Sequence, residues 1–188
     1  MQRRRRLVES LEVKATTEAL GTDIDFQNEL AFWGQVSVPE LSVVLVHVEL
    51  TERVHRLHHW QAKSDPFYGD HLMFERLADG VGAFVDKVAE KAIGMGGPEN
   101  VDLVTRTESL ARLMDALSLL GSTVPGKGDL ARRSLAATSS LVRVLDLAAS
   151  SMREMGTLTR GVDNMLAGIE DVVEDGFYLL KQRIAESV

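Results

Sequence analysis

Apolar side chains recur at intervals of three and four residues along most of the chain. Three runs show this spacing most clearly: Leu41, Val44, Leu45 and Val48; Leu141, Val144, Leu145 and Ala148; and Val162, Leu166, Ile169, Val173, Phe177 and Leu180. Such spacing places apolar side chains on one face of an α-helix. Alternation with a period of two, which is typical of half-buried strands, is absent over any useful length. The pattern therefore predicts an all-α protein.

Breaking residues and one capping pattern set the expected ends of the first two helices. Ser37-Val38-Pro39-Glu40 has Glu three residues after Ser, which is typical of a capping box. The first long helix should therefore start after Ser37 and run to about Lys63, where Ser64-Asp65-Pro66 breaks it. The second helix should run from near Phe67 to the stop signal Gly94-Met95-Gly96-Gly97-Pro98.

Three further helices complete the expected fold. A shorter helix should cover roughly residues 101 to 120, followed by a loop over about residues 121 to 128. The third long helix should run from about residue 129 to 155, and Gly156 separates it from the fourth, at about residues 157 to 184. Four long helices, with a short helix between the second and the third, describe a four-helix bundle.

The bundle should comprise residues 37–188, preceded by an N-terminal extension over residues 1–36. The extension is expected to be helical over residues 5–20 and less regular after that. It begins with the basic run Arg3, Arg4, Arg5 and Arg6. The 188 residues carry 28 acidic and 21 basic side chains, a net charge of −7, so the rest of the chain is clearly acidic. This balance argues against a surface that coats nucleic acid and suits a protein that attracts cations.

The composition excludes several classes of protein. The chain has no cysteine, which excludes a disulfide framework, a thiolate zinc site and a cysteine nucleophile. No apolar run reaches the roughly 18 residues of a membrane span. The segment after Arg6 carries Glu9, Glu12 and Lys14 rather than the apolar stretch of a signal peptide. A cytoplasmic protein without membrane contact is therefore expected.

Candidate metal ligands gather along the second expected helix. His71 and Glu75 are four residues apart, and so are Asp86 and Glu90. At about 100° per residue, the step from Glu75 to Asp86 returns to within ~20° of the same direction, so the four side chains share one stripe. Burying such groups is costly unless they are paired or bind metal. His59, near the end of the first helix, can add a fifth ligand.

The two pairs are too far apart to hold one metal ion, because they lie roughly 16 Å apart along the helix axis. A second copy of the helix, packed antiparallel about a two-fold axis, would bring the first pair of one chain to the second pair of the other. Gly80 and Gly82, with Ala78 and Ala83 nearby, would lie at this crossing and permit a close approach. The spacing predicts a symmetric dimer with two identical intersubunit sites. Imidazole with carboxylate suits iron, manganese or zinc, and open, oxygen-rich ligation favours iron redox chemistry.

Each pair taken alone has a plainer interpretation. An exposed helix face also carries polar residues four apart, and most of these are only solvated. Under that interpretation the chain is a structural helical-bundle oligomer that binds no iron stoichiometrically. The combination of the five candidate ligands with Trp60, directly after His59, favours a metal site.

The spacing of these residues also follows a known motif. The motif comprises His59-Trp60, His71, Glu75, Asp86 and Glu90, with Lys63 and Phe67 between the histidines and weaker matches at Gly96-Gly97, the loop length before Asp129, Glu174 and Lys181. It resembles the ferroxidase signature of the Dps family, the DNA-binding proteins from starved cells, which are twelve-subunit mini-ferritins. The resemblance covers roughly residues 37 to 184 and keeps every spacing of the signature.

The resemblance implies a fold, an assembly and an activity. The fold would be a ferritin-like four-helix bundle that assembles from two-fold dimers into a dodecamer. The activity would be that of a ferroxidase, an oxidoreductase that oxidises Fe²⁺ with peroxide or dioxygen, stores ferric mineral and limits oxidative stress. His59, His71 and Glu75 of one subunit would bind iron with Asp86 and Glu90 of its two-fold mate.

Two features outside the ligand set add to the interpretation. The resemblance implies that Trp60 is a site-proximal aromatic that absorbs stray oxidising equivalents, and the alternative is plain packing at a helix end. The run Arg3 to Arg6 can contact DNA phosphates without reading sequence, and several Dps proteins use basic tails in this way. A non-enzymatic protein that binds and compacts DNA is therefore an alternative function. A solvated terminus, or one docked on the acidic shell, is the alternative for the arm.

The chain departs from the Dps pattern at several positions. Glu75 stands where the family usually has Asp, which keeps the carboxylate but lengthens the side chain. Ser64-Asp65-Pro66 replaces the usual Gly-Pro-Asn, the helix expected over about residues 101 to 120 is longer than in the family, and residues 1–36 have no obvious counterpart. Oligomer size is the expectation that these departures affect most.

Overall fold

The computed structural model describes residues 25–34, 36–63, 67–117 and 129–185. Every regular element within these ranges is a helix, so the prediction of an all-α protein is confirmed for them. Four expectations lie outside these ranges: the arginine run Arg3 to Arg6, the helix over residues 5–20, the breaker Ser64-Asp65-Pro66 and the loop over residues 121–128.

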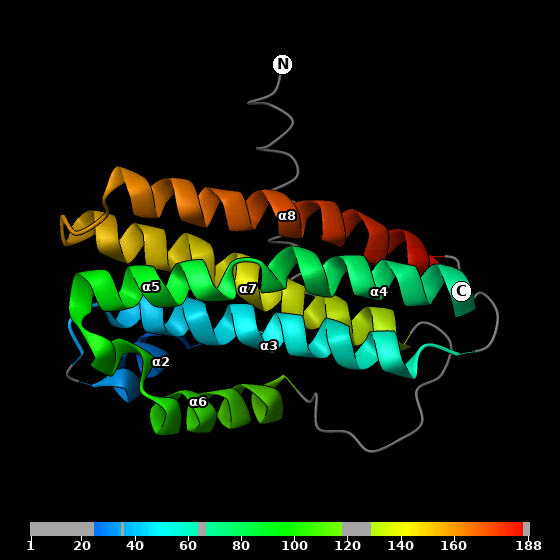
Figure 1. Ribbon diagram of the computed structural model, residues 1–188, viewed down its shortest axis with the longest axis horizontal. Helices are drawn as coiled ribbons and strands as arrows, with labels where there is room; N and C mark the ends of the chain where they lie inside the picture. The colour runs from blue at the N-terminus through cyan, green and yellow to red at the C-terminus, as the bar shows by residue number, and fades with distance from the viewer. Residues whose placement is uncertain (1–24, 35, 64–66, 118–128, 186–188) are drawn as a thin grey trace.

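The long helices lie lengthwise beside one another and form a bundle (Figure 1). They are α3 (Pro39–Gln61), the consecutive helices α4 (Phe67–Gly82) and α5 (Val85–Gly96), α7 (Asp129–Glu154) and α8 (Arg160–Ala185). α3 packs against α4, α5 and α7, and α8 packs against α7 and α4. These contacts close a ring around one apolar core.

The apolar pattern of the fourth long helix is confirmed. α8 buries all six predicted positions: Val162, Leu166, Ile169, Val173, Phe177 and Leu180. The turn before it follows from two residues. Gly156 adopts a φ of 71°, the left-handed conformation that favours glycine. The hydroxyl of Thr159 accepts a hydrogen bond from the backbone N–H of Val162 at 3.2 Å and so caps α8.

The predicted capping box at the start of α3 is wrong. Ser37 is exposed, and the cap residue is Val38, which has no side-chain cap bond. Asn100, which is fully buried, takes this role from a short 3₁₀-helix, η1 (Pro98–Val101). Its Oδ1 accepts from the N–H of Val38 at 3.1 Å, and its backbone carbonyl accepts from the hydroxyl of Ser42 at 2.8 Å. A side chain distant in the sequence therefore satisfies the helix end.

Polar side chains join α3 to α7 along the core, and we call this line the α3–α7 seam. It consists of four levels: Ser151 Oγ donating to Glu40 Oε1 at 2.8 Å, Ser140 Oγ with His47 Nδ1 at 2.9 Å, Thr51 Oγ1 donating to the carbonyl of Ala137 at 3.3 Å, and Ser134 Oγ with His55 Nδ1 at 3.0 Å. All these side chains except that of Ser151 are buried. Buried polar groups need such partners because leaving them unpaired is costly.

The second predicted helix is interrupted, which corrects the expectation of one continuous helix. Ala83 and Phe84 form a turn between α4 and α5. The N–H of Phe84 donates to the carbonyl of Val81 at 3.0 Å, a tighter bond than the regular α-helical one. The rotation calculated for a continuous helix therefore does not apply across this turn, although α4 and α5 still follow each other along the bundle (Figure 1).

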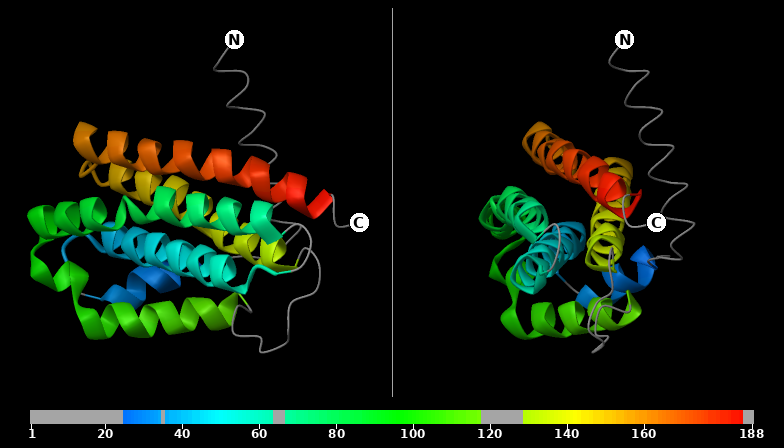
Figure 2. Two further views of the ribbon diagram at one scale, coloured as in Figure 1. Left: turned by 45° about the vertical axis from the view of Figure 1, so that its right-hand side comes forward. Right: turned by 90° about the vertical axis from the view of Figure 1, so that its right-hand side faces the viewer.

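Two shorter helices cover one side of the bundle (Figure 2). They are α2 (Phe26–Trp33) and α6 (Leu103–Ala116), which contact each other and α3. The expectation of a less regular stretch after residue 20 is wrong over α2. Asp25 caps this helix by accepting from the N–H of Asn28 at 3.1 Å, and Phe26 and Trp33 are buried in the core.

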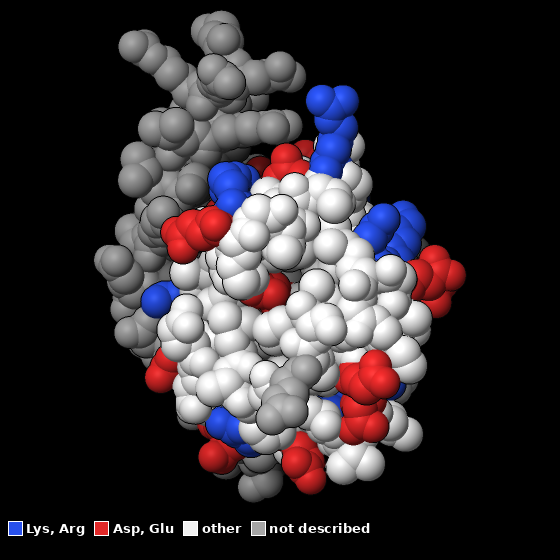
Figure 3. Space-filling view, turned by 90° about the vertical axis from the view of Figure 1, so that its left-hand side faces the viewer, with Lys and Arg blue, Asp and Glu red and all other residues white. Residues whose placement is uncertain are grey.

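The surface carries both signs of charge. Figure 3 shows the end of the bundle that bears the turn between α7 and α8, where basic and acidic side chains are scattered around the rim. This face of the described residues presents no large patch of a single sign. Among the described helices, none is both long and apolar enough to cross a membrane.

Candidate functional site

Two of the predicted ligands meet where α3 ends and α4 begins. His59 lies in the last turn of α3, and His71 lies in the second turn of α4. Their imidazole rings stack with centroids 3.8 Å apart and planes at 26°. Phe67 stacks on the other side of His71, with ring centroids 5.2 Å apart. The structure therefore places the ring of His59 beside that of His71, and its role as a metal ligand stays a prediction.

Reciprocal hydrogen bonds fix the orientation of the two rings. Nδ1 of His59 donates to the backbone carbonyl of His71 at 3.0 Å, and Nδ1 of His71 donates to the carbonyl of His59 at 3.0 Å. Because a carbonyl only accepts, each Nδ1 must carry its proton. Nε2 is then the ring nitrogen that can accept a hydrogen bond or bind a metal. This is the arrangement that metal-binding histidines usually adopt.

The local fold supplies one of these acceptors. The last carbonyls of an α-helix have no partner within the helix. His59 lies within that last turn, since α3 ends at Gln61. The donation from His71 therefore satisfies a carbonyl that the helix leaves open. The same hydrogen bond joins the start of α4 to the end of α3.

The three carboxylates of the predicted site are divided between the two helices. Glu75 is partly buried and lies one turn beyond His71 on α4. Asp86 and Glu90 are exposed and lie one turn apart on α5. Within the described ranges, no three His, Asp or Glu side chains are grouped so that one chain could hold a metal ion. The five predicted ligands therefore do not form one cluster in the described chain, and we call His59, His71 and Glu75 the histidine half-site, and Asp86 and Glu90 the carboxylate half-site, of the predicted metal site.

An ion-pair cluster borders the histidine half-site. Nε of Arg56 donates to Oε1 of Glu52 at 3.2 Å, and Nη2 donates to Oδ1 of Asp79 at 2.8 Å. The hydrogen bond to Asp79 raises the pKa of Arg56 above its usual value, so the guanidinium is charged. Sequence reasoning missed this cluster. One signal could have identified the pair of Glu52 and Arg56, because oppositely charged residues four apart on a helix often interact.

The two glycines expected at a crossing of two chains are close to neighbouring helices of their own chain, and the crossing itself stays a prediction. A Cβ atom on Gly80 would lie 3.0 Å from Cγ1 of Val172 on α8, and one on Gly82 would lie 3.1 Å from Cγ of Glu52 on α3. Both glycines therefore permit close packing inside their own chain. Ala78 is also fully buried, whereas Ala83, in the turn between α4 and α5, is exposed.

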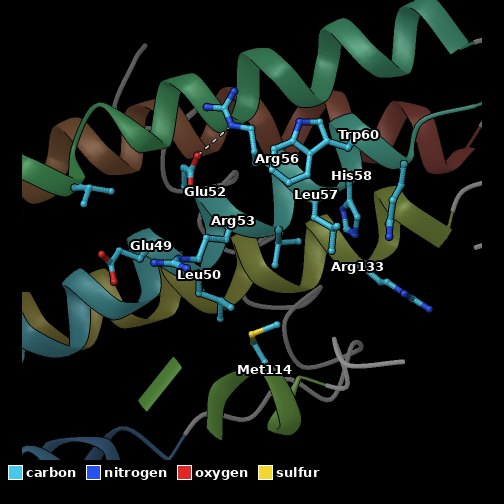
Figure 4. A pocket seen from close by; sticks show the side chains of 13 residues that line it. Glu49, Leu50, Glu52, Arg53, Arg56, Leu57, His58, Trp60, Met114 and Arg133 are labelled. Carbon is cyan, nitrogen blue, oxygen red and sulfur yellow. Dashed lines mark hydrogen bonds and ion pairs between the residues drawn. The ribbon is translucent and has the colours of Figure 1, made fainter. Parts of the chain in front are cut away.

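A groove of about 580 Å³ runs along α3, and none of the five predicted ligands lines it. Trp60, Leu57 and His58 line it from α3, and Arg133 lines it from α7 (Figure 4). Trp60 is 71% exposed, so packing at the helix end does not explain it. Further large apolar side chains on α4 and α5, those of Leu72 and Ile93, are also exposed. Each of α3, α4 and α5 therefore exposes a large apolar side chain close in the sequence to a predicted ligand.

The remaining histidines are buried in the core. Burial lowers the pKa of His47 to about 3 and, with a smaller contribution from the charge of His58, that of His55 to about 3. Burial and, secondarily, the charge of Arg133 lower the pKa of His58 to about 4. Nδ1 of His58 lies 2.7 Å from the same hydroxyl, Ser134 Oγ, that contacts His55. These rings serve packing between helices and stay neutral.

The geometry thus brings two imidazoles together, with Glu75 one helical turn beyond His71, whereas Asp86 and Glu90 lie on a separate helix. Such a donor set suits a divalent transition metal. The chain matches no model of a known protein family, and no curated protein matches it significantly.

Proposed function

We propose that this protein is a ferritin-like mini-ferritin of the Dps type, which oxidises Fe²⁺ at intersubunit sites and stores the product as ferric mineral. The observation that carries the proposal is the reciprocal bonding of His59 and His71 through Nδ1, which leaves the Nε2 atom of each ring as the nitrogen that can bind a metal. The resemblance of the whole ligand spacing to the Dps signature supports the same conclusion.

The second half of each site comes from another copy of the chain. Asp86 and Glu90 are exposed on α5, and their own histidine half-site does not reach them. A two-fold dimer across α3, α4 and α5 brings the carboxylate half-site of each chain to the histidine half-site of its mate. It also covers the exposed apolar side chains of Leu57, Trp60 and Leu72. By resemblance, six such dimers form the closed dodecamer that holds the mineral.

The chemistry follows from the ligand types. The Nε2 atoms of His59 and His71 bind Fe²⁺, and the carboxylates, which are hard ligands, favour Fe³⁺ over Fe²⁺. With peroxide as oxidant, two Fe²⁺ ions each give up one electron, and the O–O bond of one H₂O₂ breaks. With two water molecules, the products are two FeO(OH) units and four protons. Peroxide is thereby consumed without free hydroxyl radical.

Mixing two inactive variants tests the intersubunit site. One variant carries His71→Ala and Glu75→Ala, and the other carries Asp86→Ala and Glu90→Ala. Neither should oxidise Fe²⁺ alone, because every site lacks ligands. In a heterodimer of the two, one site has every ligand, so about half of the wild-type activity per dimer should return. No recovery in heterodimers verified by native mass spectrometry contradicts the proposal, as does full activity of either parent.

A further inference from the structure

The groove along α3 combines a buried polar base with apolar walls. Its volume of about 580 Å³ is within the range of pockets that hold small organic molecules, roughly 300–1,000 Å³. His58 lies at the base, with 2% of its surface exposed, whereas Trp60 stands at the rim and is 71% exposed (Figure 4). The walls include apolar side chains from three helices: Leu57 of α3, Val85 of α5 and Met114 of α6.

A directed chain of hydrogen bonds fixes the ring of His58. Oγ1 of Thr138 donates to the carbonyl of Ser134 at 2.8 Å, so it can only accept from Nε2 of His55, 3.4 Å away. Because a neutral imidazole has one donor and one acceptor, Nδ1 of His55 must accept the hydroxyl proton of Ser134 at 3.0 Å. The same hydroxyl oxygen then accepts from Nδ1 of His58 at 2.7 Å.

This order of donors leaves Nε2 of His58 as an acceptor. The ring carries one proton, on Nδ1. Within the described chain Nε2 has no hydrogen-bond partner, yet it is not closed off from solvent, so it faces the groove that the ring lines. Oε1 of Gln61, three residues further along α3, is buried, belongs to the same groove and also lacks a partner among the described residues. The groove therefore offers two acceptors about one helical turn apart and needs a donor.

The charged side chains of the groove disfavour a cationic ligand. Three arginines line it, Arg53, Arg56 and Arg133, against two glutamates, Glu49 and Glu52. Both carboxylates already pair with arginines, with N–O distances of 3.2 and 3.5 Å. A cation would therefore meet an excess of positive charge and carboxylates that are engaged. Guanidinium groups also attract the face of an aromatic ring.

We propose that the groove binds an uncharged aromatic molecule with a hydroxyl group, a phenol, whose O–H donates to Nε2 of His58. The aromatic body of the ligand packs on the apolar walls, and Trp60 supplies a ring for stacking at the rim. None of the five predicted metal ligands lines the groove, so the inference goes beyond the proposed function. In the proposed dimer a second chain would meet the rim at Leu57 and Trp60, whereas His58 stays at the base.

Isothermal titration calorimetry of the full chain in its native assembly, without iron, tests the class of ligand. The probe is 4-ethylphenol. In 4-ethylanisole a methoxy group replaces the hydroxyl, so this molecule cannot donate and should bind about tenfold more weakly. Tyramine keeps the hydroxyl but adds an ammonium group, and the excess of arginines should make it bind more weakly than 4-ethylphenol.

His58→Asn tests the acceptor. The asparagine amide can still donate to Ser134 but has no atom at the position of Nε2. Affinity for 4-ethylphenol should fall about tenfold, and the preference over 4-ethylanisole should disappear.

His47→Asn is the matched control. His47 is also buried, and its Nδ1 lies 2.9 Å from the hydroxyl of Ser140 on α7, but it does not line the groove. This variant should keep the wild-type affinity for 4-ethylphenol. Circular dichroism verifies that both variants are helical.

Five results overturn the inference: no binding of 4-ethylphenol to the wild type at millimolar concentration, equal wild-type affinities for 4-ethylphenol and 4-ethylanisole, tighter binding of tyramine, unchanged affinity in folded His58→Asn, and an equal loss in His47→Asn. The comparison of the ligands uses only the wild type, so it decides the matter even where His58→Asn does not fold. All five leave the ferroxidase proposal standing. Absence of iron oxidation would contradict that proposal and leave the groove unaffected.

Discussion

His59 and His71 each donate a proton to the other's backbone carbonyl, so neither ring depends on the other's side chain for its orientation. Substituting one histidine removes its own Nε2 but leaves the carbonyl that orients the remaining ring. The stacking contact between the rings, 3.8 Å between centroids, is the only direct link between the two side chains that the described structure records.

We therefore predict that the two histidines contribute independently to iron binding. His59→Phe and His71→Phe keep an aromatic ring in the stack, and each should weaken anaerobic Fe²⁺ binding by roughly 10- to 100-fold. Residues in contact usually show non-additive effects, but here each remaining ring keeps its backbone acceptor, so the free-energy losses should add and the double variant should show the product of the two factors. Calorimetric titration of Fe²⁺ measures this. A single variant as weak as the double variant would show that one ring holds the other in place.

Tryptophan fluorescence should report the site. The chain has two tryptophans, of which Trp33 is 3% exposed in the core and Trp60 is 71% exposed directly after His59. Binding of Co²⁺, a paramagnetic substitute for Fe²⁺, should quench Trp60 and leave Trp33 unaffected. Trp60→Phe should abolish the quenching without changing the bound Co²⁺. Equal quenching in that variant would place the metal away from this helix end.

Acid should destabilise the bundle through its buried imidazoles. His47 and His55 have pKa values of about 3 in the folded chain and about 6.5 when unfolded. Between these values the unfolded state binds more protons, so stability is complete above about pH 6.5 and falls as the pH decreases. Each ring should cost about 2 kcal/mol between pH 7 and pH 5.

Urea unfolding at the two pH values measures this loss of stability. His55→Gln removes one of the rings and should reduce the difference between pH 7 and pH 5 by about 2 kcal/mol. The comparison is made within each variant, so any loss of packing common to both pH values cancels. An unchanged difference in His55→Gln would show that its ring does not titrate on unfolding.

Two glycines near the end of α5 should respond oppositely to alanine. A Cβ atom on Gly94 meets nothing within 4 Å, so Gly94→Ala should raise the free energy of unfolding by roughly 0.5–1 kcal/mol. On Gly96 it would collide with the side chain of Asn100 and lie 2.6 Å from Cγ2 of Val38. Gly96→Ala should lower the free energy of unfolding by about 1–3 kcal/mol. Thermal or urea unfolding of the pair checks the sign, and equal effects would contradict the packing of Asn100.

The basic run at the start of the chain separates DNA binding from iron chemistry. Replacing Arg3, Arg4, Arg5 and Arg6 by Ala should abolish retardation of DNA in gels, because these side chains would supply the phosphate contacts. Iron oxidation should be unchanged, since all five expected ligands remain. Retardation by the wild type should weaken with salt and strengthen in the oligomer through multivalency. Unchanged retardation in the variant would exclude this run as the contact.

Local sequence was sufficient where a regular pattern determined the structure. The spacing of Val162, Leu166 and Ile169 predicted α8 because a helix that lies against one core must present its apolar residues at that period. The interruption between α4 and α5 was not predicted, although Gly80 and Gly82, directly before the turn, disfavour a helix. That turn depends on how the two halves pack against α3 and α8.

In the candidate site, too, the features that depend on contacts between distant segments could not be predicted from local sequence. The spacing of His59 and His71 predicted their meeting, but their bonds to each other's carbonyls depend on where α3 ends against α4. The prediction of a capping box was wrong because the start of α3 is capped by the side chain of Asn100, which is more than sixty residues away in the sequence. The bridge from Arg56 to Asp79 likewise joins residues that only the antiparallel packing of two helices brings together.

The α3–α7 seam has a mechanical consequence for the bundle. Its four hydrogen-bonded pairs follow one another along the two antiparallel helices. Residue numbers rise on α3 and fall on α7, from Glu40 with Ser151 to His55 with Ser134. Sliding one helix by a single turn of about 5.4 Å would break every level at once and bury unpaired groups. Apolar contacts alone tolerate several alignments of two helices along their axes, whereas the hydrogen bonds of the α3–α7 seam permit one. The seam therefore fixes the position of α3 along the bundle axis relative to α7. It thereby also fixes the axial position of His59, near the end of α3.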